Sequence, residues 1–362
     1  MNLNAAESFS ASYDEARTRF LDAARNAGGA LERIAHPERG PDGKDLSTDL
    51  AWFGPKDAER VLVLISGTHG VEGYCGSGAQ VDWLRRGEVA GVPAGTAVLM
   101  IHAINPFGFA WNRRVTEDNV DLNRNWIDFG APLPENRDYV TLADAVCPPA
   151  WSEEAQRQSL GSMMQFIQSR GMPAFKQAIS GGQYTHPKGL FFGGAGPTWS
   201  RRTQTQIIRE KLSKASKIAI IDYHTGLGPW GFAEKIVTVP PGSDMFKRAR
   251  SWFGASVTSP VSGTSTSADI AGDGLSAAVG LLRHAELTCV ALEYGTKPVM
   301  DVLDALRADA WLHGHGDVHS PEGRRIKQQV RDAFYGDTDD WKGMVAGQSL
   351  MACREALKGL QE

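Results

Sequence analysis

Four short apolar runs, each bounded by turn residues, constrain the fold of this chain more than any other feature. They cover residues 61–65, 97–103, 218–222 and 288–292. Each run has the length of a buried strand, and helical patterns such as those at 78–86 and 201–213 separate them. Strands that alternate with helices form parallel sheets that are covered on both faces. We therefore predict an α/β fold: an open, mostly parallel mixed β-sheet flanked by helices on both faces.

The rest of the chain is organised around this pattern. Apolar residues recur at helical spacing from Ala11 to about Ile34, so we predict that residues 1–50 form an N-terminal helical segment that packs on the core. Residues 51–320 form the main domain, and residues 321–362 form C-terminal helices of the same domain. The stretch at 130–200 is rich in Pro, Gly and Trp around one helical pattern at 152–168, which indicates a long insertion over the sheet.

Charge and cysteine usage exclude several kinds of protein. The 362 residues include 38 Lys and Arg against 42 Asp and Glu, a net charge of −4, and the basic residues are scattered. We therefore expect no nucleic-acid partner. The sequence has neither a secretory signal pattern nor an apolar run of membrane-spanning length, and its four cysteines lie far apart. These features predict a cytoplasmic protein with free thiols and no membrane partner.

A histidine and a glutamate follow the first predicted strand directly. His69 and Glu72 stand three residues apart in a Gly-flanked loop, and His224 follows the strand at 218–222. Either histidine alone is more typical of a core or surface position. The carboxyl ends of parallel strands, however, meet at one edge of the sheet, where ligands bind. Catalytic zinc takes three nitrogen or oxygen ligands and keeps one position for water, so His69, Glu72 and His224 are candidate ligands of one Zn²⁺.

Two more carboxylates accompany the strand ends. Glu293 follows the strand at 288–292, where it is a candidate general base. The alternative is a structural salt bridge to Arg113 or Arg283. Asp222 lies two residues before His224 on the same strand face. It is either a carboxylate that orients a ligand histidine or a capping residue.

The loop after the second strand, residues 105–125, is too polar to be core. Its arginines, Arg113, Arg114 and Arg124, match carboxylates and can stabilise a developing oxyanion, so the loop is a candidate substrate-binding segment. A solvated surface turn is the alternative, and it fits residues 117–119 best. The motif His313-Gly-His315-Gly-Asp-Val-His319 is either a compact metal cluster or a surface loop, and it lacks the strand-end context of His224.

Five motifs together carry a resemblance to a known family. GTHGVEG, NPFGF, NVDLNRNW, DYHTGLG and LEYGT follow one another between residues 67 and 296. In this order they resemble the zinc metallocarboxypeptidases of the carboxypeptidase A clan, in a bacterial branch catalogued as a domain of unknown function. H-x-x-E, DLNR and D-x-H-T also resemble the related aspartoacylase and succinylglutamate desuccinylase branch. The resemblance implies a phosphorylase/hydrolase-like zinc carboxypeptidase fold, with residues 51–320 as the catalytic domain.

The resemblance also implies roles for individual residues. It makes His69, Glu72 and His224 the zinc ligands, Glu293 the catalytic base and Arg114 the group that polarises the scissile carbonyl. Asn123 and Arg124 would bind a terminal carboxylate of the substrate, and Arg113 is the alternative to Arg114. One departure stands out, because residues 256–278 lack the tyrosine that many members bring onto that carboxylate.

The predicted reaction is therefore zinc-dependent hydrolysis of an amide bond next to a free carboxylate. A metallocarboxypeptidase that removes the C-terminal residue of a small peptide-like substrate is the first interpretation. The alternatives are an amidohydrolase of N-acyl amino acids and a catalytically inactive binding module.

Overall fold

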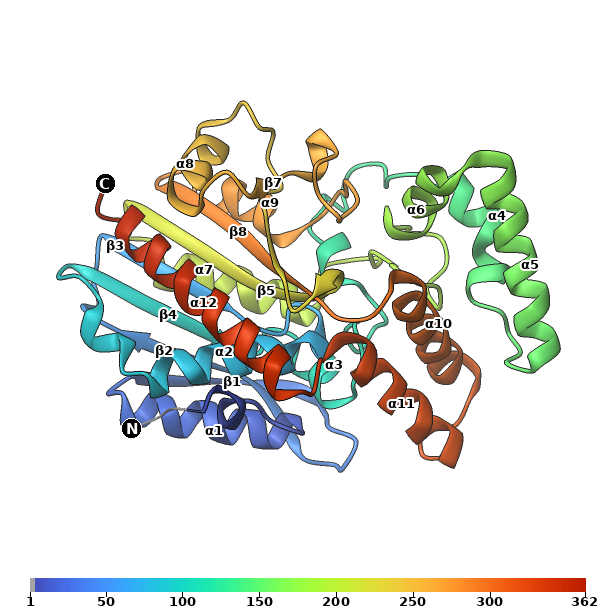
Figure 1. Cartoon of the computed structure of the whole chain (residues 1–362), viewed down its shortest axis with the longest axis horizontal. Helices are drawn as coiled ribbons and strands as arrows, with labels where there is room; N and C mark the ends of the chain where they lie inside the picture. The colour runs from blue at the N-terminus through green and yellow to red at the C-terminus, as the bar shows by residue number, and fades with distance from the viewer. Residues whose placement is uncertain (1–3) are drawn as a thin grey trace.

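A single eight-stranded mixed sheet forms the centre of the computed structural model, which describes residues 4–362 (Figure 1). Its strand order is β1-β2-β4-β3-β5-β8-β6-β7. The strands are β1 (Ala30–Arg39), β2 (Asp45–Phe53), β3 (Arg60–Ile65), β4 (Thr96–His102), β5 (Lys217–Trp230), β6 (Ala233–Ile236), β7 (Val257–Thr258) and β8 (Glu286–Gly295).

The four predicted strands are confirmed, and they lie together in the middle of the sheet. β4, β3, β5 and β8 run parallel in that order, whereas the β1–β2, β2–β4 and β6–β8 pairs are antiparallel. The prediction of a mostly parallel mixed sheet is therefore confirmed. β5 and β8 continue beyond their apolar runs, so that His224 and Glu293 still lie within the sheet as register partners.

Helices cover both faces of the sheet. They are α1 (Tyr13–Asn26), α2 (Gly73–Arg85), α3 (Pro106–Ala110), α4 (Arg137–Val146), α5 (Glu153–Arg170), α6 (Met172–Ser180), α7 (Trp199–Lys211), α8 (Asp244–Phe253), α9 (Gly274–Leu281), α10 (Val299–His315), α11 (Pro321–Phe334) and α12 (Asp339–Gly359). In Figure 1, α2 and α12 lie in front of the sheet and α7 lies behind it.

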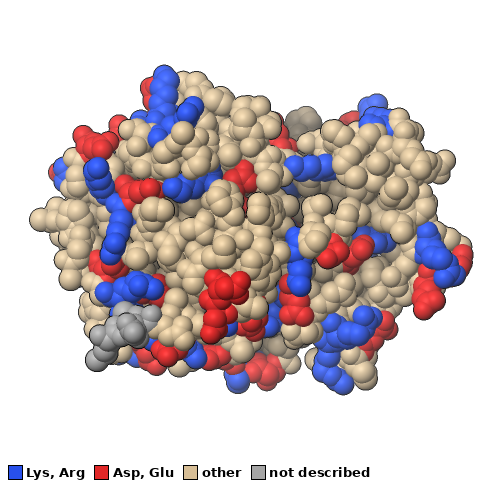
Figure 2. Space-filling model, in the orientation of Figure 1, with Lys and Arg blue, Asp and Glu red and all other residues tan. Residues whose placement is uncertain are grey.

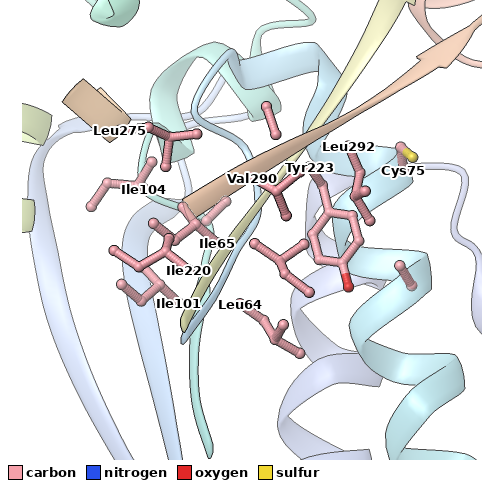
Figure 3. Packing of buried hydrophobic residues seen from close by; sticks show 14 of the residues in the cluster. Leu64, Ile65, Cys75, Ile101, Ile104, Ile220, Tyr223, Leu275, Val290 and Leu292 are labelled. Atoms are coloured by element: carbon pink, nitrogen blue, oxygen red, sulfur yellow. The ribbon is translucent and has the colours of Figure 1, made fainter. Parts of the chain in front are cut away.

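Side chains of the central strands point alternately to the two faces of the sheet, and each face packs into one layer of the core. Tyr223 and Leu292, which are register partners on β5 and β8, lie on the side of α2 together with Cys75 (Figure 3). Ile220 and Leu275 lie on the other side of the sheet (Figure 3). Because side chains alternate along a strand, Asp222 and His224 share the face of Ile220.

The prediction that residues 1–50 form a helical segment is partly wrong. The predicted helix ends at Asn26, and β1 and β2 follow it as an antiparallel pair. β1 is a largely exposed edge strand, and the three-residue spacing of Leu31 and Ile34 in it is also typical of a helix. β2 buries polar side chains that have hydrogen-bond partners; for example, Thr48 Oγ1 donates to the Ala103 carbonyl over 2.8 Å. Neither strand therefore produces an apolar run that a sequence pattern can detect.

The stretch at 130–200 contains three helices instead of the single helix predicted there. α5 matches the predicted stretch, and α4 and α6 pack against it. Figure 1 shows this group beyond the sheet, on the side where α3 and α10 follow their strands. α4 and α6 are short, and Pro and Gly stand close to their boundaries, which hides them from pattern analysis.

The last 42 residues form the helices α11 and α12, and α12 contributes to the core. Ala352, Cys353 and Ala356 of α12 are fully buried. The boundaries at residues 50 and 320 stay a prediction.

Lys and Arg are interspersed with Asp and Glu on the face shown in Figure 2. Within residues 4–362, no helix combines the length and the apolar character that crossing a bilayer requires.

Candidate active site

The loop after β3 has a backbone that is fixed from both sides. The Val71 amide donates to the Arg113 carbonyl over 2.8 Å, and the Gly70 amide donates to the Arg114 carbonyl over 3.0 Å. A Cβ atom at Gly70 would lie 2.1 Å from the backbone of Gly108, so only glycine permits this approach. The sequence thereby holds His69 and Glu72 in defined positions next to the loop that carries the arginines.

His69, Glu72 and His224 converge on one point. The Nδ1 atom of His69 lies 3.0 Å from one Glu72 oxygen, and the Nδ1 atom of His224 lies 3.0 Å from the other. The two Nδ1 atoms are 3.2 Å apart. All three side chains are buried, and one ligating atom from each lies within 4.8 Å of the others. Two imidazole nitrogens and one carboxylate in this arrangement match the ligand set of a catalytic zinc site.

A buried carboxylate lies behind each histidine. Asp121 lies 3.1 Å from Nε2 of His69, and Asp222 lies 2.9 Å from Nε2 of His224. Thr68 Oγ1 donates to both oxygens of Asp222, over 2.8 and 3.0 Å. At His224, a carboxylate that accepts the Nε2 proton leaves the Nδ1 lone pair free for a metal ion. Nε2 of His69 also lies 2.9 Å from Nη2 of Arg114, which can only donate. The donor chemistry of the site therefore fits zinc.

Burial and charge act in opposite directions on the two glutamates of the site. Burial alone would raise the pKa of Glu72, but His69, His224 and Arg114 hold this pKa below its ordinary value. Burial raises the pKa of Glu293 to about 8, and the nearby negative charge of Glu72 adds to the shift. The Leu227 amide donates to Glu293 over 3.0 Å, and among the described residues Glu293 has no salt-bridge partner. Its position is that of a group available to exchange a proton.

Arg114 lies against the metal-ligand candidates. Its Nη1 donates to Glu72 and its Nε donates to Asp121, both over 3.0 Å. The ring centroid of Phe191 lies 5.4 Å from the guanidinium carbons of both Arg114 and Arg124. Phe191 has a φ of 52°, which is unusual for a bulky residue and is often found at functional sites.

Asn123 and Arg124 lie on the short helical turn Leu122–Arg124. They line the cavity that His69, His224 and Glu293 also line. Arg124 Nε donates to the carbonyl of Ser180 over 3.2 Å, at the end of α6. Asn123 Oδ1 accepts a hydrogen bond from the Gly274 amide over 3.1 Å. The end of α6 in the insertion and the start of α9 therefore each hydrogen-bond one of these two side chains.

Arg113 points elsewhere, contrary to its predicted place in the substrate site. Its Nε donates to Asp309 over 2.8 Å, and its Nη2 donates to Asn119 over 2.8 Å. Arg113 does not line the cavity that contains the other candidates. A buried arginine with a buried carboxylate partner has a structural role, so Arg113 no longer serves as the alternative to Arg114.

The candidates share one cavity of about 280 Å³. His69, Arg114, Asn123, Arg124, His224 and Glu293 all line it. Apolar side chains from α6, α10 and the neighbouring strands form most of the remaining wall. An apolar pocket with a few convergent polar groups is the usual form of a small-molecule site.

The histidine-rich motif at 313–319 does not form a second metal site. His313 and His315 lie in the last turn of α10, and Nε2 of His313 lies 2.6 Å from Nζ of Lys327. In the part of the chain that the structure describes, the one group of potential metal ligands is His69, Glu72 and His224.

Sequence reasoning missed three residues of the site. Asp121 lies in the DLNR motif, and a carboxylate close to a predicted ligand loop was a usable signal. Thr68 precedes His69 directly, but its contact with Asp222 depends on how β3 and β5 pair. Nothing in the sequence marks Phe191, because its role follows from its backbone conformation and from the insertion.

The sequence profile of the family described as "Protein of unknown function (DUF2817)" matches residues 9–348. The chain belongs to this family. A comparison with curated proteins finds no match. Solved structures with low similarity to this family member include bovine thrombin-activatable fibrinolysis inhibitor in complex with tick carboxypeptidase inhibitor, at 10% identity and a TM-score of 0.46 over 96% of this chain and 98% of that chain.

Two other solved structures are similar at the same level. Carboxypeptidase A from Helicoverpa armigera is 12% identical, with a TM-score of 0.43 over 89% of this chain and 74% of that chain. A succinylglutamate desuccinylase from a Silicibacter species is 12% identical, with a TM-score of 0.38 over 84% of this chain and 66% of that chain.

Proposed function

We propose that the protein is a zinc-dependent hydrolase that cleaves an amide bond next to a free carboxylate. The observation that carries this proposal is the convergence of His69, Glu72 and His224 in one cavity with a buried glutamate and two arginines. Removal of the C-terminal residue from a peptide-like substrate, as in a metallocarboxypeptidase, and hydrolysis of an N-acyl amino acid both fit this class.

Each group has a defined task in this reaction. His69, Glu72 and His224 would hold a zinc ion, which would supply Lewis-acid chemistry and lower the pKa of water toward about 7. Glu293 accepts the proton of the attacking water and then donates it to the leaving amine. Arg114 donates hydrogen bonds to the carbonyl oxygen as negative charge develops on it. Arg124 and Asn123 hold the free carboxylate of the substrate.

Three substrate classes test the proposal: peptides, N-acyl amino acids and their carboxyl-amidated counterparts. We expect the zinc-loaded protein to hydrolyse substrates with a free carboxylate, and chelation to abolish the activity until zinc is restored. Amidation should remove most of the activity because Arg124 loses its partner. A protein that is fully loaded with zinc and hydrolyses none of these compounds would contradict the proposal.

Glu293→Gln separates catalysis from metal binding. This variant should retain stoichiometric zinc and lose hydrolysis, because the amide cannot accept the proton. Glu286→Gln is the matched control, since Glu286 lies on the same strand at its exposed start and pairs with Lys217 over 3.8 Å. Full activity in Glu293→Gln would remove this residue from the mechanism.

A further inference from the structure

One part of the cavity wall is apolar and carries no charged side chain. It consists of Leu227, Val299, Met300, Val302, Leu303, Leu306 and Phe334, which we call the α10 wall. Most of these residues come from the first turns of α10, and the others come from the end of β5 and from α11. The catalytic groups proposed above do not account for this surface.

The α10 wall begins at the reacting groups. The amide of Leu227 donates to Glu293 over 3.0 Å. Leu306 and Arg114 also line a second, smaller cavity together with Phe191, so they lie close to each other. At Gly226, a Cβ atom would lie 3.0 Å from Phe334 and 3.8 Å from Val302, which joins β5, α10 and α11 into one surface.

The carboxylate-binding pair has different neighbours. Arg124 contacts the carbonyl of Ser180, and Asn123 contacts the amide of Gly274. A substrate whose carboxylate lies at Arg124 and whose scissile carbonyl lies at Arg114 therefore directs its acyl group toward the α10 wall.

The charges along the cavity limit what this acyl group can be. Among residues 4–362, the carboxylates that line the cavity are Asp273 and Glu293. Asp273 caps α9 by accepting a hydrogen bond from the Ser276 amide over 2.8 Å. Its negative charge also acts electrostatically on Arg124, in the part of the cavity that holds the carboxylate-binding pair. An ammonium group on the acyl side would be buried away from water, and the proposed base would be its only carboxylate partner there. Burial of a charge without a partner of its own is unfavourable.

The exposed residues that line the cavity include apolar side chains as well as Lys176. Val299 and Met172 line the cavity, and yet they are 61% and 52% exposed. Val299, at the start of α10, therefore gives an apolar ligand further surface to contact at the rim of the cavity.

We infer that the α10 wall binds an apolar acyl chain, so that the substrates are N-acyl amino acids with acyl chains of several carbons. The inference rests on the function proposed above and narrows its substrate class. Hydrolysis adds one water, breaks the amide C–N bond, and releases the carboxylic acid and the amino acid.

A chain-length series tests the inference with the zinc-loaded protein. The substrates are N-acetyl-, N-butanoyl- and N-hexanoyl-leucine, with the free dipeptide alanyl-leucine for comparison. We expect kcat/KM to rise by about fourfold for each methylene that enters the cavity, and the dipeptide to be the poorest substrate. A kcat/KM that is independent of chain length, or highest for the dipeptide, would overturn the inference.

Val299→Asp supplies a matched pair with Val140→Asp. Both valines are exposed and lie near the start of a helix, but Val140, at 51% exposed, is in α4 and outside the cavity. Val299→Asp should lower kcat/KM for the hexanoyl substrate about tenfold and raise it for alanyl-leucine. Val140→Asp should change neither, and equal effects of the two substitutions would overturn the assigned role of the wall.

Calorimetric binding distinguishes failure of the inference from failure of the proposed function. If the zinc-loaded protein hydrolyses nothing but binds N-hexanoyl-leucine at least tenfold more tightly than N-acetyl-leucine, the proposed reaction fails and the acyl site stands. If both bind equally, the acyl site is wrong whatever the activity.

Discussion

The carboxylates behind the histidines give the most specific prediction about zinc affinity. Asp222 accepts from Nε2 of His224 over 2.9 Å and is itself held by Thr68. Replacement by Asn keeps the shape but removes the negative charge that fixes the histidine tautomer. Outer carboxylates of this kind contribute about 10- to 100-fold in metal affinity. We therefore expect Asp222→Asn to weaken zinc binding by about 1.4–2.7 kcal/mol.

The assay is competition for zinc against a chelator of known affinity, at constant pH. Thr68→Val removes only the hydrogen bonds that hold Asp222, so its effect should be smaller, about fivefold. Asp49→Asn is the control, because this buried carboxylate pairs with Arg17 over 2.6 Å in β2 and has no contact with the candidate ligands. A zinc Kd for Asp222→Asn within twofold of the wild-type value would refute the reasoning.

Three further predictions concern turnover, substrate affinity and stability. Arg114→Ala should lower kcat by about 10²- to 10³-fold with little change in KM, and a raised KM at unchanged kcat would contradict its role. Phe191→Leu removes the aromatic face shared by two guanidinium groups, so KM for carboxylate substrates should rise by about 2- to 30-fold. Phe191→Tyr keeps an aromatic ring and should resemble wild type. Equal KM values for the two variants would exclude this role. Burial lowers the pKa of His102 to about 4, so between pH 6.5 and 4 the unfolded chain binds a proton that the folded chain does not. The free energy of unfolding from urea titrations should therefore fall by up to about 1.4 kcal/mol per pH unit on acidification through this group, and His102→Gln should reduce that slope.

The sequence was informative wherever a buried strand ended in a polar residue. His224 and Glu293 were predictable because parallel strands bring their carboxyl ends to one edge, and the register of β5 and β8 makes these two residues neighbours. The short spacing of His69 and Glu72 fixed their proximity through local geometry alone.

The residues that escaped prediction depend on contacts between distant segments. Arg113 and Arg114 are adjacent and chemically equivalent in the sequence, and only the packing of α10 decides that Arg113 pairs with Asp309. Phe191 reaches the arginines because the insertion folds back: the amide of Asp121 donates to the carbonyl of Phe192 over 2.8 Å. Strand β1 was hidden for a different reason, because an exposed edge strand needs no apolar run.

The most direct test of the central claim is a crystal structure of the zinc-loaded protein with anomalous diffraction measured at the zinc edge. We expect one strong peak, at about 2.0–2.2 Å from Nδ1 of His69, Nδ1 of His224 and a carboxylate oxygen of Glu72. A peak elsewhere, for example among the histidines at 313–319, or the absence of any peak within reach of these three residues, would contradict the account.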